Sequence, residues 1–263
     1  MSFHRRIGVR MNVLKFTLSG KTAFFKKPDV NSNYYFTYGN IHKVVLLGMF
    51  GAIMGYGGYN QQVRSKEALY PEFYEKLQDI KVSIEPKCKG FKKKLQIFNN
   101  TVGYANADGN LIVREQWLED PCWNVYLLLK GDIEKKIAER ILTSKATFIP
   151  YLGKNDHMAT ISEVEIKELK EINLTKEYGI NSLYVKDCFE TCVEEDFSDI
   201  FDLDVELESG FRYEERLPVA LEETTNQYIL VPFVYTNAKV VVKPERSDGI
   251  LMGSYNEKII QFY

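Results

Sequence analysis

The segment from Lys21 to Asn60 constrains the fold more than any other, because a loop rich in lysine and aromatic residues runs directly into an apolar, glycine-marked helix. Gly48, Gly51 and Gly55 lie at offsets of three and seven, so they share one helix face. Each glycine inside a helix costs about 1 kcal/mol relative to alanine, and a close approach of the helix backbone to the sheet or to a ligand is expected to compensate. We predict a core helix over residues 41–56, with the functional residues in the preceding loop and at the helix start.

That loop combines positive charge with aromatic faces. Lysine head groups contact phosphates, and unstacked bases lie on aromatic rings, so the combination indicates binding of single-stranded nucleic acid. The helix-start histidine, His42, is expected to contact a phosphate or to cap the turn. The cations are Lys21, Lys26, Lys27 and Lys43, and the rings are those of Phe24, Phe25, Tyr34, Tyr35, Phe36 and Tyr38.

Charge is divided unequally along the chain. The formal net charge is -2, but residues 1–103 hold 17 Lys and Arg against 6 Asp and Glu, a net +11. Residues 104–263 hold 17 against 30, a net -13. The division predicts an anionic partner for the first part and a solvated acidic surface for the second.

Two further groups of residues are predicted to contact RNA. Lys92, Lys93 and Lys94 end the densest lysine cluster, which runs from residue 87 to 94. The turn at Tyr151, Lys154 and Asn155 combines a stacking ring, a glycine that allows close backbone approach, and a cation. A solvated strand edge and an ordinary surface turn are the alternative interpretations.

Hydrophobic periodicity predicts the element order strand, helix, strand, hairpin, strand, helix, strand. The strands are expected over residues 12–18, 79–85, 93–104, 111–117, 123–130 and 159–169, and the helices over 41–56 and 133–142. This order is that of an α+β, ferredoxin-like domain of the RNA-recognition-motif type. We predict this domain over residues 11–170, with an inserted β-hairpin thumb at about 95–117 turned by Asp108-Gly109.

The remainder, residues 171–263, is predicted to be a small β-rich appendage. Within it, residues 228–235 and 238–242 are expected to form a hairpin turned by Thr236-Asn237. Alternating acidic residues at 202–208 are expected to form an exposed strand face rather than a metal site. Four cysteines are too few for a disulfide scaffold, and no metal or other cofactor is expected.

Several stretches resemble one known family. LKFTLSGKTAFFKKPDV followed by NYYFTYGNIHKVVLLGMFGAIMGY resembles the start of the Cas-five family, and looks most like its type I-B branch. EQWLEDPCWNVYLLL (115–129) resembles the segment after that family's thumb, and FIPYLGKNDHMATI (148–161) resembles its glycine loop after a helix. The resemblance covers most of the chain up to about residue 169, and Met11 is a second possible start.

The resemblance implies a noncatalytic subunit of a type I-B CRISPR surveillance complex in antiviral defence. Such a subunit binds the 5′ handle of the guide crRNA and caps the backbone filament. Its implied partners are the Cas-seven backbone subunit, met by the thumb, and the large Cas-eight subunit, with target DNA engaged indirectly through the complex. A cytoplasmic protein without membrane contact is expected, since the longest apolar run, residues 44–58, is too short to span a bilayer.

Two alternative functions remain open. The first is a metal-independent endoribonuclease that processes precursor crRNA, because the type I-C branch of the family cuts RNA with a tyrosine, a lysine and a histidine. General acid–base cleavage requires a group that titrates near neutrality. The chain offers His4, His42 and His157, and none of them accompanies the lysines at 87–94. The second alternative is a generic single-stranded RNA-binding module.

Overall fold

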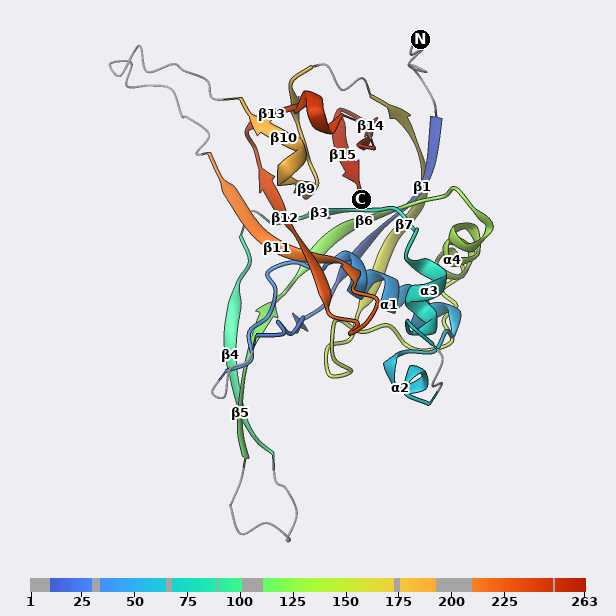
Figure 1. Cartoon of the computed structure of the whole chain (residues 1–263), viewed down its shortest axis with the longest axis vertical. Helices are drawn as coiled ribbons and strands as arrows, with labels where there is room; N and C mark the ends of the chain where they lie inside the picture. Colours follow the sequence, from blue (N-terminus) through green and yellow to red (C-terminus); the bar gives the residue numbers. More distant parts are fainter. Residues whose placement is uncertain are drawn as a thin grey trace, which may run out of the picture.

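A six-stranded sheet forms the centre of the computed structural model, which describes residues 10–29, 34–64, 68–88, 90–100, 111–172, 176–192, 210–247 and 249–263 (Figure 1). The strand order is β15-β14-β7-β1-β6-β3, and every neighbouring pair is antiparallel. The strands are β1 (Arg10–Ser19), β3 (Val82–Pro86), β6 (Cys122–Leu128), β7 (Thr160–Glu171), β14 (Leu251–Tyr255) and β15 (Lys258–Phe262).

Helices cover one face of this sheet. Alternate residues of β1 point towards them, and Phe16 meets Phe50 edge to face at 6.3 Å between ring centroids. The helices are α1 (Lys43–Met54), α2 (Tyr59–Gln62), α3 (Glu72–Leu77) and α4 (Asp132–Leu142). The α+β class predicted from the sequence is confirmed, and α1 and α4 lie where the periodicity places them.

The opposite face of the sheet is closed by the sheet's own curvature, which brings the C-terminal hairpin β14–β15 across it. The last residue, Tyr263, exchanges two backbone hydrogen bonds with Val82 of β3, so the sheet curves round until its two edges meet. Inside the curve lies an apolar cluster of Met11, Val13, Tyr126, Leu128, Leu169, Ile260 and Phe262. These side chains are buried, so this part of the sheet face offers no ring on which a base could stack.

A polar network fixes the hairpin to the sheet. The buried carboxylate of Glu85 accepts hydrogen bonds from the Tyr126 hydroxyl at 2.5 Å and the Asn124 amide at 2.9 Å, and it pairs with the ammonium of Lys258 on β15. A buried charge needs such partners, because an unpaired carboxylate loses its hydration without compensation. The C-terminal hairpin is therefore tied into the central sheet.

Three small sheets surround this centre. Their orders are β11-β12-β9, β10-β13-β8 and β2-β5-β4. The strands are β2 (Thr22–Ala23), β4 (Lys93–Asn100), β5 (Leu111–Glu119), β8 (Tyr178–Gly179), β9 (Tyr184–Val185), β10 (Phe189–Thr191), β11 (Arg212–Leu221), β12 (Tyr228–Thr236) and β13 (Lys239–Val242), with short 3-10 helices at Lys186–Cys188 and Pro244–Arg246.

The predicted hairpin of residues 228–235 and 238–242 is wrong. Both strands form, as β12 and β13, but β12 pairs with β11 and β9, whereas β13 pairs with β10 and β8. The intended turn residues bond elsewhere, because Thr236 donates to the Phe211 carbonyl and Asn237 accepts from the Phe211 amide. The chain therefore passes from the β11-β12-β9 sheet to the β10-β13-β8 sheet at these residues and does not form a hairpin turn.

Strands β4 and β5 form a long antiparallel pair, which we call the arm (Figure 1). Its register runs from Lys93 opposite Leu118 to Asn100 opposite Leu111, and Figure 1 shows it extending away from the central sheet. At the base of the arm, Leu118 is buried and pairs with β2. The predicted Asp108-Gly109 turn lies outside the described residues.

The three glycines of α1 have three different roles. A Cβ added at Gly51 would lie 2.4 Å from the Cβ of Phe73, so a close approach occurs there, although its partner is α3 and not the expected sheet or ligand. Gly55 ends the helix in a left-handed conformation with φ 85°, and is not an interior residue. An added Cβ at Gly48 would meet one atom of Phe73, at 3.9 Å.

These environments predict opposite effects of two alanine substitutions. Gly48→Ala should stabilise the fold by up to about 1 kcal/mol through helix propensity. Gly51→Ala should destabilise it by about 1–3 kcal/mol, because Phe73 or the helix must move. Urea unfolding of both variants measures the difference, and equal effects would contradict the packing of Gly51 against Phe73.

Candidate nucleic-acid interface

The loop that precedes α1 is held against the base of the arm. The amide of Tyr35 donates to the Arg114 carbonyl, and the amide of Gln116 donates to the Tyr35 carbonyl, each at 2.9 Å. Within the loop, Lys27 bonds to Phe36 and Tyr38 bonds to Phe25 through the backbone. The aromatic residues of this loop are therefore fixed by backbone pairing.

The aromatic residues of the loop divide into a buried group and an exposed group. Phe24, Phe25 and Tyr38 are 2–3% exposed and belong to the interior, whereas Tyr34, Tyr35 and Phe36 are 36–39% exposed. The rings of Tyr34 and Phe36 stack with centroids 6.4 Å apart. The exposed group, and not Tyr38, therefore offers accessible ring faces.

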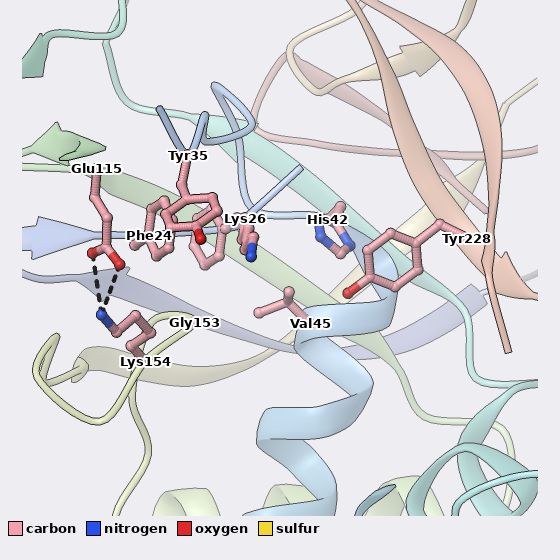
Figure 2. Close-up of a pocket in the computed structure, with 10 residues that line it drawn as sticks. Phe24, Lys26, Tyr35, His42, Val45, Glu115, Gly153, Lys154 and Tyr228 are labelled. Atoms are coloured by element: carbon pink, nitrogen blue, oxygen red, sulfur yellow. Dashed lines mark hydrogen bonds and ion pairs between the residues drawn. The ribbon is translucent and has the colours of Figure 1, made fainter. Parts of the chain in front are cut away.

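A cavity of about 400 Å³ opens where the loop, the arm, the start of α1 and β12 meet (Figure 2). We call it the first cavity. Rings form much of its wall, and two lysines and one carboxylate supply its charges. It is lined by Phe24, Phe25, Lys26, Tyr35, His42, Val45, Glu115, Gly153, Lys154 and Tyr228.

One wall of the first cavity is an ion pair between the half-buried Lys154 and the buried Glu115. The Lys154 ammonium lies 3.0 and 3.1 Å from the two carboxylate oxygens of Glu115, as the dashed lines in Figure 2 show. Glu115 also accepts a hydrogen bond from the indole of Trp117 at 2.8 Å. Glu115 is 5% exposed, so its charge depends on these partners.

The loop carrying Lys154 requires a glycine. Gly153 has φ 93°, and an added Cβ would lie 1.8 Å from the carbonyl oxygen of Phe24. The amide of Phe24 in turn donates to the Leu152 carbonyl. The backbone therefore passes directly over Phe24 and brings Lys154 to the cavity.

Lys26 supplies the second cation of the first cavity. Its ammonium lies 3.9 Å from the ring centroid of Tyr35, which is cation–π geometry. In the part of the chain that the structure describes, no ion pair involves Lys26, whereas Lys154 is paired with Glu115. Because Glu115 neutralises Lys154, Lys26 gives the first cavity a net positive charge.

His42 precedes α1 and is caged by aromatic edges. Its ring lies 6.2 Å from Phe25, 5.2 Å from Tyr38 and 5.4 Å from Tyr228, all edge to face. Its side chain does not cap α1, so that part of the sequence interpretation is wrong. Burial lowers the pKa of His42 to about 3, so the imidazole is neutral near pH 7. It therefore does not offer a cation to a phosphate.

The depressed pKa predicts a specific acid sensitivity. Between about pH 6.5 and 3 the unfolded chain binds a proton at His42 that the folded chain does not, so stability falls as the pH falls. From pH 6.5 to 4.5 the wild type should lose roughly 2–3 kcal/mol more than His42→Phe, at about 1.4 kcal/mol per pH unit. Urea unfolding at each pH measures this, and parallel pH curves would contradict a neutral buried His42.

A second cavity, of about 600 Å³, adjoins the first along α1 and shares Val45, Gly153 and Tyr228 with it. Its floor includes Gly48. The rings of Tyr59 from α2 and Tyr151 from the 148–153 loop line its sides. These two side chains are 42% and 44% exposed, so both rings are accessible. The two cavities together form a groove from the arm along one side of α1.

The structure brings some of the predicted site residues together and separates others. Lys26, His42 and Lys154 line the first cavity, and Tyr151 lines the second. Lys21, Lys92 and Asn155 are exposed without lining either. Tyr34 lies beside Arg114 of the arm, at 5.7 Å.

The remaining predicted lysines have protein partners. Lys27 pairs with Glu215 at 2.8 Å and Lys94 with Glu119 at 3.7 Å, while Lys93 donates to the Thr37 carbonyl at 3.4 Å. Lys43 is buried near Lys81 and Asp79, and burial, followed by the charge of Lys81, lowers its pKa to about 8. Lys43 lines neither cavity.

Sequence reasoning missed three residues of this site. Glu115 and Tyr228 line the first cavity, and His157 fixes the Lys154 loop through a 2.7 Å hydrogen bond between its Nδ1 and the Thr22 hydroxyl. Burial, followed by the charge of Lys154, lowers the pKa of His157. Val113 and Trp117, two residues before and after Glu115, share its strand face and are apolar, so a carboxylate between them on that face was the available signal.

Two classes of site are absent from the described part of the chain. No group of three or more His, Cys, Asp or Glu side chains there is placed to hold a metal ion. The acidic residues at 202–208 lie outside the described residues. None of the described helices is long and apolar enough to cross a membrane.

No protein-family model matches the chain, and no curated protein matches it. Several solved structures show similarity to the chain. A chain of a CRISPR RNA-guided surveillance complex is 12% identical with a TM-score of 0.47, over 88% of this chain and 91% of that one. A CRISPR protein from Archaeoglobus fulgidus is 11% identical with a TM-score of 0.45, over 95% and 98%.

A third similar structure is a chain of the type III-B Cmr-beta complex bound to cognate target RNA and AMPPnP. It is 11% identical with a TM-score of 0.43, over 87% of this chain and 85% of that chain. At these identities and TM-scores the likeness by itself assigns no function.

Proposed function

We propose that this chain is a noncatalytic Cas-five subunit of a type I-B CRISPR surveillance complex, which binds the 5′ handle of the guide crRNA and caps the backbone filament. The observation that carries the proposal is the groove along α1, where aromatic rings line two adjoining cavities and Lys26 and Lys154 line the first of them. Rings that accept bases and cations that contact phosphates are the requirements of a single-stranded RNA site.

The topology supports the same proposal. β1, α1, β3, β6, α4 and β7 follow one another in the chain, and their strands lie in the sheet order β7-β1-β6-β3. We infer that this is the ferredoxin-like arrangement, with the arm inserted between β3 and β6 as the thumb. Because the C-terminal hairpin buries part of the helix-free face, the RNA path is expected along the loops and α1.

The proposed partners follow from the sequence resemblance and the shape of the arm. The Cas-seven backbone subunit would contact the arm, and the large Cas-eight subunit would bind the same assembly, with target DNA engaged through the complex. Leu95, Ile97 and Ile112 of the arm are 50–53% exposed, which suits a strand pair that packs against another protein.

Recovery of bound RNA tests the proposal. The full chain should be purified together with its neighbouring gene products, and the co-purifying RNA sequenced from its 5′ end. A uniform 5′ end derived from the CRISPR repeat is the expected result. RNA of random sequence would favour the generic single-stranded RNA-binding module, and absence of RNA would contradict the proposal.

Purified protein is expected not to cut repeat RNA. Burial lowers the pKa of both His42 and His157, which disfavours at each the imidazolium form that serves as a general acid near pH 7. Labelled repeat RNA should be incubated with the full chain with and without EDTA, and with His42→Phe and His157→Phe as controls. Specific cleavage that either substitution abolishes would favour the endoribonuclease.

A further inference from the structure

His42 has a hydrogen-bonding atom that the described residues leave unused. The side chain is 2% exposed, and no described residue bonds to its Nδ1, which is buried. Buried polar atoms in folded proteins nearly always have a partner, so this nitrogen requires an explanation. His42 lines the first cavity, and Figure 2 shows its ring between Lys26 and Tyr228.

The first cavity suits one flat aromatic ligand. Its volume of about 400 Å³ lies within the range of about 300–1,000 Å³ that is common for small-molecule sites. Tyr35 of the loop and Tyr228 of β12 provide rings from two separate segments, and Lys26 provides a positive charge beside Tyr35. A ring system with a phosphate attached, which is a nucleotide, matches this combination.

We propose that the first cavity takes the base of one everted nucleotide, and that His42 is a specificity-determining residue whose Nδ1 forms a hydrogen bond with the edge of that base. This inference rests on the proposed function and adds selection at one position of the RNA. A neutral imidazole suits a base edge better than a phosphate, because base edges carry neutral donors and acceptors at positions that differ among the four bases.

The proposed hydrogen bond has a consequence for selectivity. A site that buries a polar atom discriminates against a ligand that leaves the atom unpaired, whereas stacking alone accepts every base. The cavity should therefore prefer one base at one position, by about tenfold or more. Stacking on Tyr151 in the second cavity, or on the exposed rings of Tyr34 and Phe36 outside the cavities, should show little preference.

The test uses the full chain and a series of single-stranded RNA probes. A fluorescent uridine decamer is substituted at one position at a time with A, C or G, and anisotropy gives the dissociation constant of each probe. The wild type should show one position with a preference of about tenfold or more. His42→Phe keeps the ring and its packing but removes both nitrogens, and the preference should fall to about twofold or less.

A second variant separates the hydrogen bond from packing. His42→Asn places an amide near the position of Nδ1, so it should recover part of the preference even though it packs less well. Thermal melting confirms that each variant folds. If the wild type binds the decamers but His42→Phe keeps the same preference, or if no position shows one, this inference is overturned and the proposed function stands. If the wild type binds no RNA, the proposed function fails as well.

Discussion

RNA binding by the full chain is expected to weaken on the order of 100-fold between roughly 50 and 200 mM salt, if about five phosphates are contacted with a logarithmic slope near -3.5. Five cations near the groove and the arm have no carboxylate partner within the described residues: Lys21, Lys26, Lys92, Lys93 and Arg114. No carboxylate neutralises these charges, so each can replace a counterion of the RNA. Anisotropy titrations at four or more salt concentrations give the slope.

A matched pair of substitutions locates this charge. Lys26 and Lys136 are both exposed and have no ion pair within the described residues, but Lys26 lines the first cavity and Lys136 lies on α4, outside both cavities. Lys26→Glu should reduce affinity and lower the slope by about one phosphate contact, whereas Lys136→Glu should change neither by much. Equal effects would show that net charge, and not the groove, determines binding, and a flat salt profile would contradict the electrostatic site.

Local pattern was sufficient to predict the elements around the core. The alternation of Leu14, Phe16 and Leu18 indicated β1, and the apolar run at residues 123–130 indicated β6, because both patterns depend on which side chains face the helices. The aromatic and lysine content of the loop before α1 likewise drew attention to a segment that lines the first cavity. Such features depend on neighbours in the chain, so a single sequence contains them.

Long-range pairing could not be predicted in the same way. The buried partner of Lys154 is Glu115, 39 residues away, and the Tyr228 ring reaches the first cavity from β12. From the sequence, His42 was expected to contact a phosphate or to cap the turn. Its burial could not be foreseen, because its aromatic cage includes the ring of the distant Tyr228. Burial decided its charge, and burial depends on the tertiary fold.

The C-terminal part shows the same limit. β14 and β15 are short, and nothing in their sequence indicates that they extend the central sheet and close against β3. The hairpin expected at Thr236-Asn237 does not form, because these residues bond to Phe211, which lies 25 and 26 residues earlier. A turn sequence permits a hairpin, but the competing partners decide whether it forms.

Removal of the outer arm is expected to abolish assembly while the fold persists. Phe98 and Val113 are paired opposite each other, so an Asn-Gly turn that replaces residues 99–112 can join them. The inner arm stays intact in this variant, because Glu115 and Leu118 are buried there and hold Lys154 and β2. The melting temperature should stay within a few degrees of the wild type, and co-purification of the backbone subunit should fall at least about tenfold.

Two further variants show which part of the arm carries each role. Leu95→Ser with Ile97→Ser changes two side chains that are 50% and 53% exposed, so it should reduce assembly without loss of stability. Leu118→Ala at the buried base should instead destabilise the fold by about 2–5 kcal/mol. If the shortened arm unfolds the protein, the outer strands belong to the core. If the shortened arm assembles normally, the arm is not the contact with the backbone subunit, because a thumb that joins two subunits cannot lose its outer half without loss of that junction.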